Sequence, residues 1–160
     1  MVSFGIVDGG IRNNIIPDEV YLEGTIRNFD MDNRAQIFEN LTTTAEMTAK
    51  ATGAEAHVHI DEGYPVTINN VELTQQMLPT MERVAGKDKV HVNDLVTGAE
   101  DFSFFALEVP GLFVFLGVTP EGQDAKSAPS NHSPYFYADE SSLKVGTELY
   151  VNWALDYSNL

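Results

Sequence analysis

The segment Gly111–Gly117, GLFVFLG, is a continuous apolar run between two glycines. A short run without polar alternation is typical of a strand that is buried on both faces, in the middle of a sheet covered by helices above and below. Residues 66–160 contain no second stretch that predicts such a strand with equal clarity. We therefore expect the central sheet of this half to need strands from outside the 160 residues.

The first 60 residues predict a second, smaller layered structure. Residues 2–7 and 20–26 have the composition of strands, and the long connection between them, GGIRNNIIPDE, is not a two-residue hairpin turn. Apolar residues at three- and four-residue steps predict a helix over 32–52, and a third strand is expected over 54–60. This order favours an α/β sandwich in which one sheet face is covered by a helix.

Helix signals also mark the second half. The stretch 61–70, DEGYPVTINN, is the expected crossing between domains, and a helical pattern follows over 71–85 with Pro79 as an expected kink. The chain should close with a helix over 139–157, capped by Asp139. The side chains that we expect on the inward side of this last helix are Leu143, Tyr150, Trp153 and Tyr157.

The charge of the chain limits its partners. There are 24 acidic residues against 9 basic ones, so the formal net charge is −15. A surface this acidic repels nucleic acid and anionic lipid, and no apolar run is long enough to span a membrane. The chain has no cysteine, and its first residues do not resemble a signal peptide. We therefore expect a soluble, cytoplasmic protein.

His132 lies in a loop, PSNHSPYFYADE, where Pro134 restricts the backbone of the residue before it. A neutral imidazole is the commonest protein ligand for zinc-like metals. A lone loop histidine is, however, more often structural. His57 and His59 are spaced so that both point to one face of a strand, but no third ligand stands at a recognisable spacing.

Several other polar side chains can be interpreted either as structural or as ligand-binding. Asn14 either shapes its loop or offers an amide to a ligand, and Arg27, at the end of a strand, is either solvated or forks around a carboxylate. Glu100 and Asp101, in VTGAEDFSFF, either begin a helix whose Phe102 and Phe105 are in the core, or act on a ligand.

Four motifs occur in this order along the chain: GGIRNNIIPDEVYLEGTIRNFD, TGAEDFSFF, VPGLFVFLG and NHSPYFYADESSLKVG. Together they resemble the C-terminal portion of the M20 family of metallopeptidases, and most of all the amidohydrolase branch that cleaves N-acyl amino acids, such as hippurate hydrolase. The resemblance implies an α/β catalytic domain with two divalent metal ions (zinc, or manganese, nickel or cobalt). It also implies an inserted α+β lid, a helix-covered sheet that usually dimerises. Residues 1–64 match the later part of the lid, and 65–160 match the C-terminal segment of the catalytic domain.

The resemblance also implies roles for single residues. His132 matches the C-terminal metal ligand of the family. Asn14 and Arg27 match lid residues that bind substrate, and Glu100 and Asp101 lie beside the substrate pocket. The other metal ligands and the paired glutamates of the family, which include the general base, have no match in this sequence. A catalytic zinc has three or more protein ligands, so the site is incomplete.

The sequence therefore predicts part of a metal-dependent amidohydrolase. Its substrate would be a small N-acyl amino acid or peptide, and the parent protein would be a homodimer through its lid. The 160-residue chain alone should be inactive. The alternative is a non-catalytic dimerisation module derived from the lid. Truncation of the sheets would leave apolar area and strand edges exposed, which favours association between chains.

Overall fold

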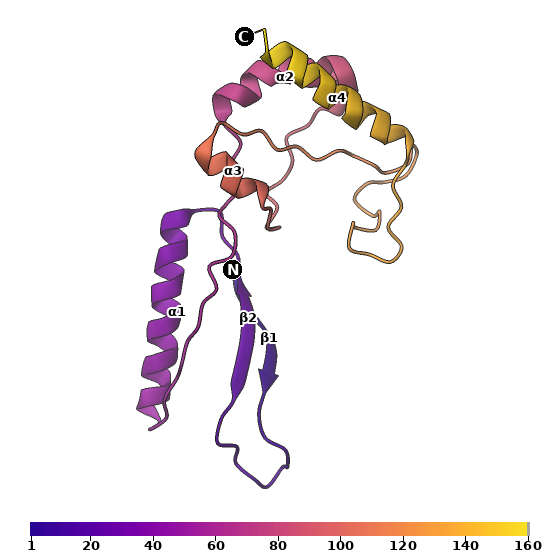
Figure 1. Ribbon diagram of the computed structural model, residues 1–160. Coiled ribbons are helices and arrows are strands. Elements are labelled where there is room, and N and C mark those ends of the chain that lie inside the picture. The colour runs from indigo at the N-terminus through magenta and orange to yellow at the C-terminus, as the bar shows by residue number, and fades with distance from the viewer. Residues whose placement is uncertain (160) are drawn as a thin grey trace. The chain divides into compact units, whose positions relative to one another are not determined.

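A computed structural model describes residues 1–159 as two compact units (Figure 1). The first unit contains Met1–Val66 together with Val96–Asp101, and the second contains Thr67–Leu95 and the chain from Phe102 onward. The described residues form helices and one small antiparallel sheet, as expected for an α/β chain. None of their helices is long and apolar enough to cross a membrane.

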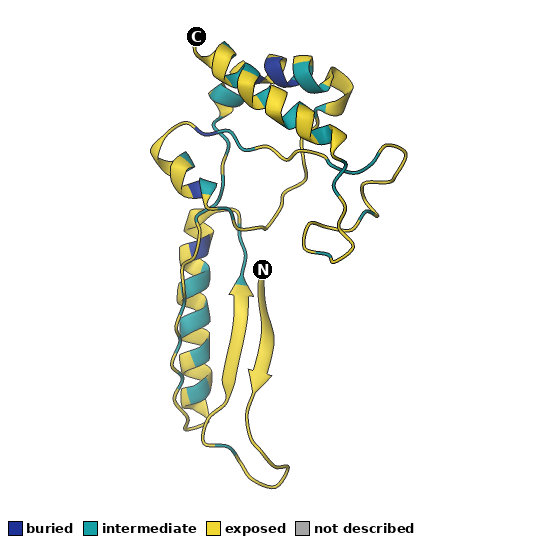
Figure 2. Cartoon of the chain, turned by 45° about the vertical axis from the view of Figure 1, so that its right-hand side comes forward, coloured by how far each residue is buried: buried dark blue, intermediate teal, exposed yellow. Residues whose placement is uncertain are grey.

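The sheet of the first unit is a hairpin of β1 (Val2–Asp8) and β2 (Tyr21–Ile26), which confirms the two predicted strands. The strands are antiparallel, and the register shifts between Phe4 and Ile6, so a bulge lies at Gly5. Both faces of the hairpin are exposed up to its last residue (Figure 2). No layer among the described residues covers either face of the hairpin.

The predicted helix of the first unit is confirmed as α1 (Met31–Ala51). Asp30 caps it, since its carboxylate accepts a hydrogen bond of 2.8 Å from the backbone N–H of Asn33. The one buried residue of α1 is Arg34, which is 8 % exposed. Its guanidinium stacks on Phe38, with 5.2 Å from Cζ to the ring centroid, and donates to the backbone carbonyl of Glu62. Arg34 therefore holds the segment around Glu62, which follows α1 in the chain, against this helix.

The prediction of a third strand over 54–60 is wrong. The segment runs along α1 in both overall views, and its burial alternates: Ala56, Val58 and Ile60 are half-buried while His57 and His59 are exposed (Figures 1 and 2). The side-chain period is that of a strand, but residues 55–60 have no backbone ladder within the described chain. Strand formation needs a hydrogen-bonded neighbour as well as the alternating pattern.

The second unit is built on α2 (Val71–Ala85) and α4 (Ser141–Tyr157), which pack together (Figure 1). Asn70 caps α2 through a 2.8 Å hydrogen bond from the backbone N–H of Leu73, and the helix continues through Pro79. Met77 and Met81, on one face of α2, are only 3 % and 7 % exposed. These two methionines are the buried apolar core of the described chain.

Polar contacts complete the packing of α2 on α4. The Thr80 hydroxyl, which is buried, donates to the Asp156 carboxylate at 2.5 Å. Arg83 donates to Asp156 at 2.5 Å and to the side-chain oxygen of Asn152 at 2.7 Å. The hydrogen bond from Thr80 is the main reason why the pKa of Asp156 is lowered; desolvation opposes this shift, and the charge and hydrogen bond of Arg83 add to it.

The start and the inward face of α4 differ from the prediction. The helix begins at Ser141, and Asp139 stands before it, accepting a 2.9 Å hydrogen bond from the Ser141 N–H. This contact lowers the pKa of Asp139. The contacts of Asn152 and Asp156 with α2 set the rotation of the helix. Of the four residues expected inside, Trp153 is half-buried, whereas Leu143, Tyr150 and Tyr157 are exposed.

The apolar run Gly111–Gly117 is not a strand within the described residues. Gly111 is buried, but Phe115 is 61 % exposed. The side-chain amide of Asn69 pairs with both backbone groups of Phe113, accepting from the N–H at 2.7 Å and donating to the carbonyl at 2.8 Å. Asn69 thus supplies one short stretch of the pairing that a neighbouring strand would supply along the whole run.

Candidate functional site

Arg27 lies just after β2 and contacts the segment Val96–Asp101, which belongs to the first unit. Its guanidinium Nη1 donates to the backbone carbonyl of Thr97, and its own backbone N–H donates to the Met1 carbonyl at 2.9 Å. The side chain is half-buried, like Glu100 in the same segment, whereas Asp101 is exposed. The structure thus brings three predicted site residues, Arg27, Glu100 and Asp101, into the same compact unit.

The two acids immediately precede a helix, α3 (Phe102–Glu108). This position fits the structural interpretation of Glu100 and Asp101 as helix-start residues. The expectation that both Phe102 and Phe105 are in a core is half wrong: Phe102 is half-buried, with its ring centroid 5.7 Å from that of Phe113, but Phe105 is 65 % exposed. The two rings are neighbours on one side of α3, but Phe113 packs against Phe102 and no described ring is recorded on the outer side of Phe105.

Asn14 lies in the loop between β1 and β2, is exposed, and belongs to a turn. Arg27 follows the opposite end of β2, as the ribbon shows (Figure 1). The six residues of β2 alone span about 20 Å at the usual strand rise. Asn14 and Arg27 of one chain are therefore too far apart to contact the same small group.

His132 is in the second unit, in a loop that is folded by local hydrogen bonds. The N–H of Ser133 donates to the carbonyl of Ser130 at 2.8 Å, and the N–H of Phe136 donates to the carbonyl of Ser133 at 3.0 Å. At the end of the loop, the N–H of Asp139 donates to the carbonyl of Val118 at 2.8 Å. The His132 side chain is exposed.

The metal centre that the resemblance implies is not built by the described residues. Within 1–159, no three His, Cys, Asp or Glu side chains are grouped so that they could hold a metal ion. His132 is a suitable donor, but one ligand falls short of the three or more that hold a catalytic zinc. The pair His57 and His59 is likewise without a third ligand. We therefore assign no metal chemistry to these residues alone.

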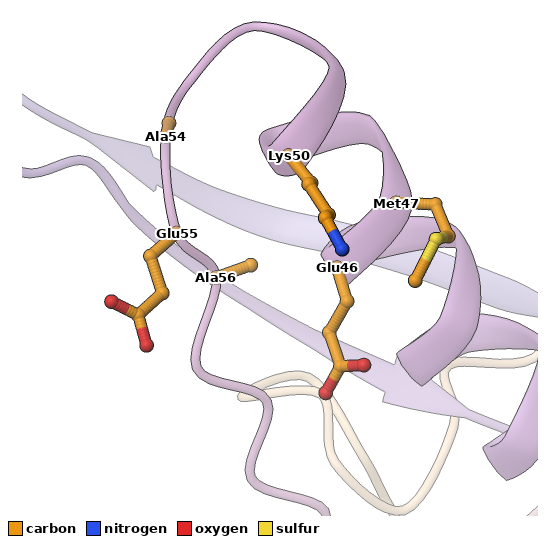
Figure 3. A pocket seen from close by; sticks show the side chains of 6 residues that line it. All are labelled: Glu46, Met47, Lys50, Ala54, Glu55 and Ala56. Atoms are coloured by element: carbon orange, nitrogen blue, oxygen red, sulfur yellow. The ribbon is translucent and has the colours of Figure 1, made fainter.

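A shallow hollow of about 390 Å³ lies at the end of α1 (Figure 3). Acidic and basic side chains line it. It contains none of the predicted site residues. The residues that line it are Glu46, Met47, Lys50, Ala54, Glu55 and Ala56.

Sequence reasoning missed the role of Thr97. Arg27 contacts its backbone carbonyl, and a backbone group has no signature in the residue type. The only available signal was the position of Arg27 at a strand end, where a guanidinium often finds a partner.

The arrangement of helices and sheet has a solved counterpart. It superimposes with a TM-score of 0.76 on the YXEP protein of Bacillus subtilis, described as a dinuclear metal binding peptidase from the M20 family. The two share 28 % sequence identity over 96 % of this chain and 40 % of that one. The α/β class expected from the sequence is thereby confirmed.

The sequence profile of peptidase family M20/M25/M40 matches residues 3–156, so the chain belongs to this family. It is 31 % identical to thermostable carboxypeptidase 2 of Saccharolobus solfataricus, over 99 % of this chain and 39 % of that protein. It is 30 % identical to the IAA-amino acid hydrolase ILR1-like 2 of Arabidopsis thaliana, over 98 % of this chain and 36 % of the relative. The chain therefore spans less than two fifths of the length of these relatives.

Proposed function

We propose that residues 1–160 are the later lid segment (1–64) and the C-terminal catalytic segment (65–160) of a metal-dependent hydrolase. Its reaction is hydrolysis of the amide bond in N-acyl amino acids or small peptides. The family match over 3–156 is the observation that carries this proposal. Relatives named as a carboxypeptidase, an IAA-amino acid hydrolase and an N-acetyldiaminopimelate deacetylase support an amide substrate. The absence of cysteine supports a reducing, cytoplasmic location.

In this proposal, the residues of the chain hold substrate and contribute to a metal centre that other residues complete. His132 is one ligand of that centre. Two divalent metal ions, when bound, would supply an activated water and polarise the scissile carbonyl. Asn14 donates its amide to substrate, Arg27 contacts a carboxylate through N–H groups not used by Thr97, and Glu100 and Asp101 border the pocket.

The separation of Asn14 from Arg27 favours a homodimer. One strand length of about 20 Å lies between them in a single chain. A small substrate can contact both residues only if they come from different protomers. Size-exclusion chromatography with light scattering should find a dimer at micromolar concentration. A stable monomer under these conditions would count against the dimer but not against the hydrolase.

The chain alone should neither bind zinc tightly nor hydrolyse hippurate, because it supplies one ligand. Calorimetric titration with zinc, and separately with manganese, tests the first point, with His132→Ala beside the matched control His91→Ala. Tight stoichiometric binding that His132→Ala abolishes would show that the site is complete here. In the protein encoded by the whole reading frame, His132→Ala should abolish hippurate hydrolysis and His91→Ala should preserve it.

A non-catalytic dimerisation module is the second candidate function. The observation that favours it is the β1–β2 hairpin, whose two faces are exposed nearly throughout. Reading the coding sequence upstream of Met1 separates the two candidates. A segment with a His-x-Asp ligand motif and a pair of glutamates supports the enzyme. A start codon without such a segment supports the module.

A further inference from the structure

The segment Val96–Asp101 is a strap. It belongs to the first compact unit, yet the residues on both sides of it, Leu95 and Phe102, belong to the second. The chain therefore enters the first unit for six residues and leaves it again. Neither strand nor helix forms within the strap, so no regular backbone pairing holds it in place. Something else has to fix its position.

The guanidinium of Arg27 provides one contact that does so. Nη1 donates to the Thr97 carbonyl, the second residue of the strap. Arg27 is itself fixed, because its backbone N–H and carbonyl both pair with Met1 at the end of the hairpin, at 2.9 and 2.7 Å. A hydrogen bond from an ionised donor is stronger than one between neutral groups. The contact between Arg27 and Thr97 is exposed, so its strength comes from the charge of the donor and from the fixed backbone of Arg27.

The strap also carries the two acids. Glu100 follows Thr97 by three residues and Asp101 by four, so both lie within about 14 Å of the anchored carbonyl even in a fully extended chain. The position of Thr97 therefore limits where the two carboxylates can be. Arg34 shows the same device elsewhere in this unit, since it donates to the carbonyl of Glu62.

We infer that Arg27 is a positioning residue: by holding the Thr97 carbonyl it fixes the strap Val96–Asp101 on the first unit, and so places Glu100 and Asp101 beside the substrate pocket. The pocket in this statement rests on the proposed function, whereas the anchoring of the strap does not. The remaining N–H groups of the guanidinium are left for the carboxylate contact proposed above.

Backbone NMR of the whole chain tests the anchoring. In the wild type, amides 97–101 should have order parameters near those of rigid backbone, about 0.85, and in Arg27→Ala they should fall below about 0.6. Arg27→Lys, which keeps one charged donor, should give intermediate values. The Thr97 carbonyl carbon should shift in Arg27→Ala and move part of the way back in Arg27→Lys. The matched control is Arg12→Ala, which removes an exposed arginine in the β1–β2 loop and should change neither measurement.

Two outcomes would overturn the inference. One is a strap that remains ordered, with an unchanged Thr97 carbonyl signal, in Arg27→Ala. The other is an equal loss of order in Arg27→Ala and Arg12→Ala. If Arg27→Ala unfolds the hairpin, the comparison of wild type with Arg27→Lys decides: an unshifted Thr97 carbonyl rejects the contact, and a shifted one supports it.

Titration with hippurate separates this inference from the proposed function. Hippurate that shifts the Arg27 side-chain signals while strap order is insensitive to Arg27→Ala supports a carboxylate role without positioning. A strap that loosens in Arg27→Ala supports positioning, whatever hippurate does. In the protein encoded by the whole reading frame, Arg27→Lys should then keep more of the wild-type kcat than Arg27→Ala does. Absence of any hydrolysis there would reject the proposed function and leave the anchoring intact.

Discussion

The two compact units bury their side chains in different ways. In the second unit, α2 and α4 pack on each other and bury Met77, Met81 and the polar residue Thr80. In the first unit, the hairpin is exposed on both faces. The one buried residue of this unit is Arg34 on α1. A helix needs only one partner surface to bury its apolar stripe. A sheet needs a covering layer and strand neighbours, and the described residues do not supply both.

This difference predicts that side-chain volume matters most in the second unit. Met77→Ala should destabilise it by about 2–5 kcal/mol, because it removes buried atoms and leaves a cavity. Urea unfolding followed by the fluorescence of Trp153, the single tryptophan, reports on α4 in this unit. The matched control is Met47→Ala in the first unit, where the side chain is exposed and the change should be within about 0.5 kcal/mol. Equal effects of the two substitutions would remove the contrast between the units.

Backbone geometry, in contrast, should matter most in the hairpin. A Cβ on Gly24 would lie 2.2 Å from the backbone oxygen of Ser3, which cannot move without breaking the pairing of β1 with β2. Gly24→Ala should therefore cost about 3 kcal/mol, at the upper end of the range for overpacking. Gly5→Ala is the control, since a Cβ there meets no atom within 4 Å. Strand signals in NMR spectra should weaken in Gly24→Ala and persist in Gly5→Ala.

In the second unit, the side chain of Asn69 takes the place of a neighbouring strand at Phe113, and it can be removed by substitution. Asn69→Ala deletes both hydrogen bonds to the Phe113 backbone and should cost about 2 kcal/mol, because a part-buried N–H and carbonyl lose their partners. Thermal unfolding monitored by Trp153 fluorescence measures the loss. Asn93→Ala, at an exposed position in the same unit, should change little. If Asn69→Ala also changes little, water or another group satisfies Phe113.

The smallest effect should be the contribution of Asp156 to acid sensitivity. Its pKa is lowered in the folded chain from an ordinary value of 3.8, so the stabilisation is fully present above pH 3.8 and is lost as the pH falls through the lower, folded value. The midpoint of thermal unfolding should therefore fall between pH 5 and pH 3 by less in Asp156→Asn than in the wild type. The control is Asp94→Asn, an exposed carboxylate in the same unit. Parallel curves for all three chains would show that Asp156 is not stabilised by folding.

Local patterns predicted the helices well. Asp30 and Asn70 cap their helices as their residue types indicate, because a cap depends on neighbours within one turn. The extended segments were harder. Residues 54–60 have a strand period, and 111–117 have the composition of a buried strand, but neither forms a ladder. Strand formation depends on a distant partner, and a local pattern cannot supply one.

The prediction of the inward face of α4 is wrong for a related reason. The apolar residues Leu143, Tyr150 and Tyr157 predicted one face, but Asp156 and Asn152 turn another face toward α2 by bonding to Thr80 and Arg83. A polar contact across helices outweighs an apolar stripe that has no surface to cover. Of the candidate site, sequence identified the residue types. The strand predicted over 20–26 already separates Asn14 from Arg27, but the residue types could not show that the partner of Arg27 is a backbone carbonyl.

The exposed connection between β1 and β2 is a place where the backbone can be divided without loss of either strand. Arg12 lies in this connection, so two synthetic or recombinant pieces that meet after Arg12 would each keep one strand whole. The first strand would then be held to β2 without a covalent link, through the backbone ladder that starts at Val2 and Ile26. A synthetic peptide of residues 1–12 carrying an isotope or a fluorophore could replace it. The hairpin is thus a ready-made point of entry for semisynthesis.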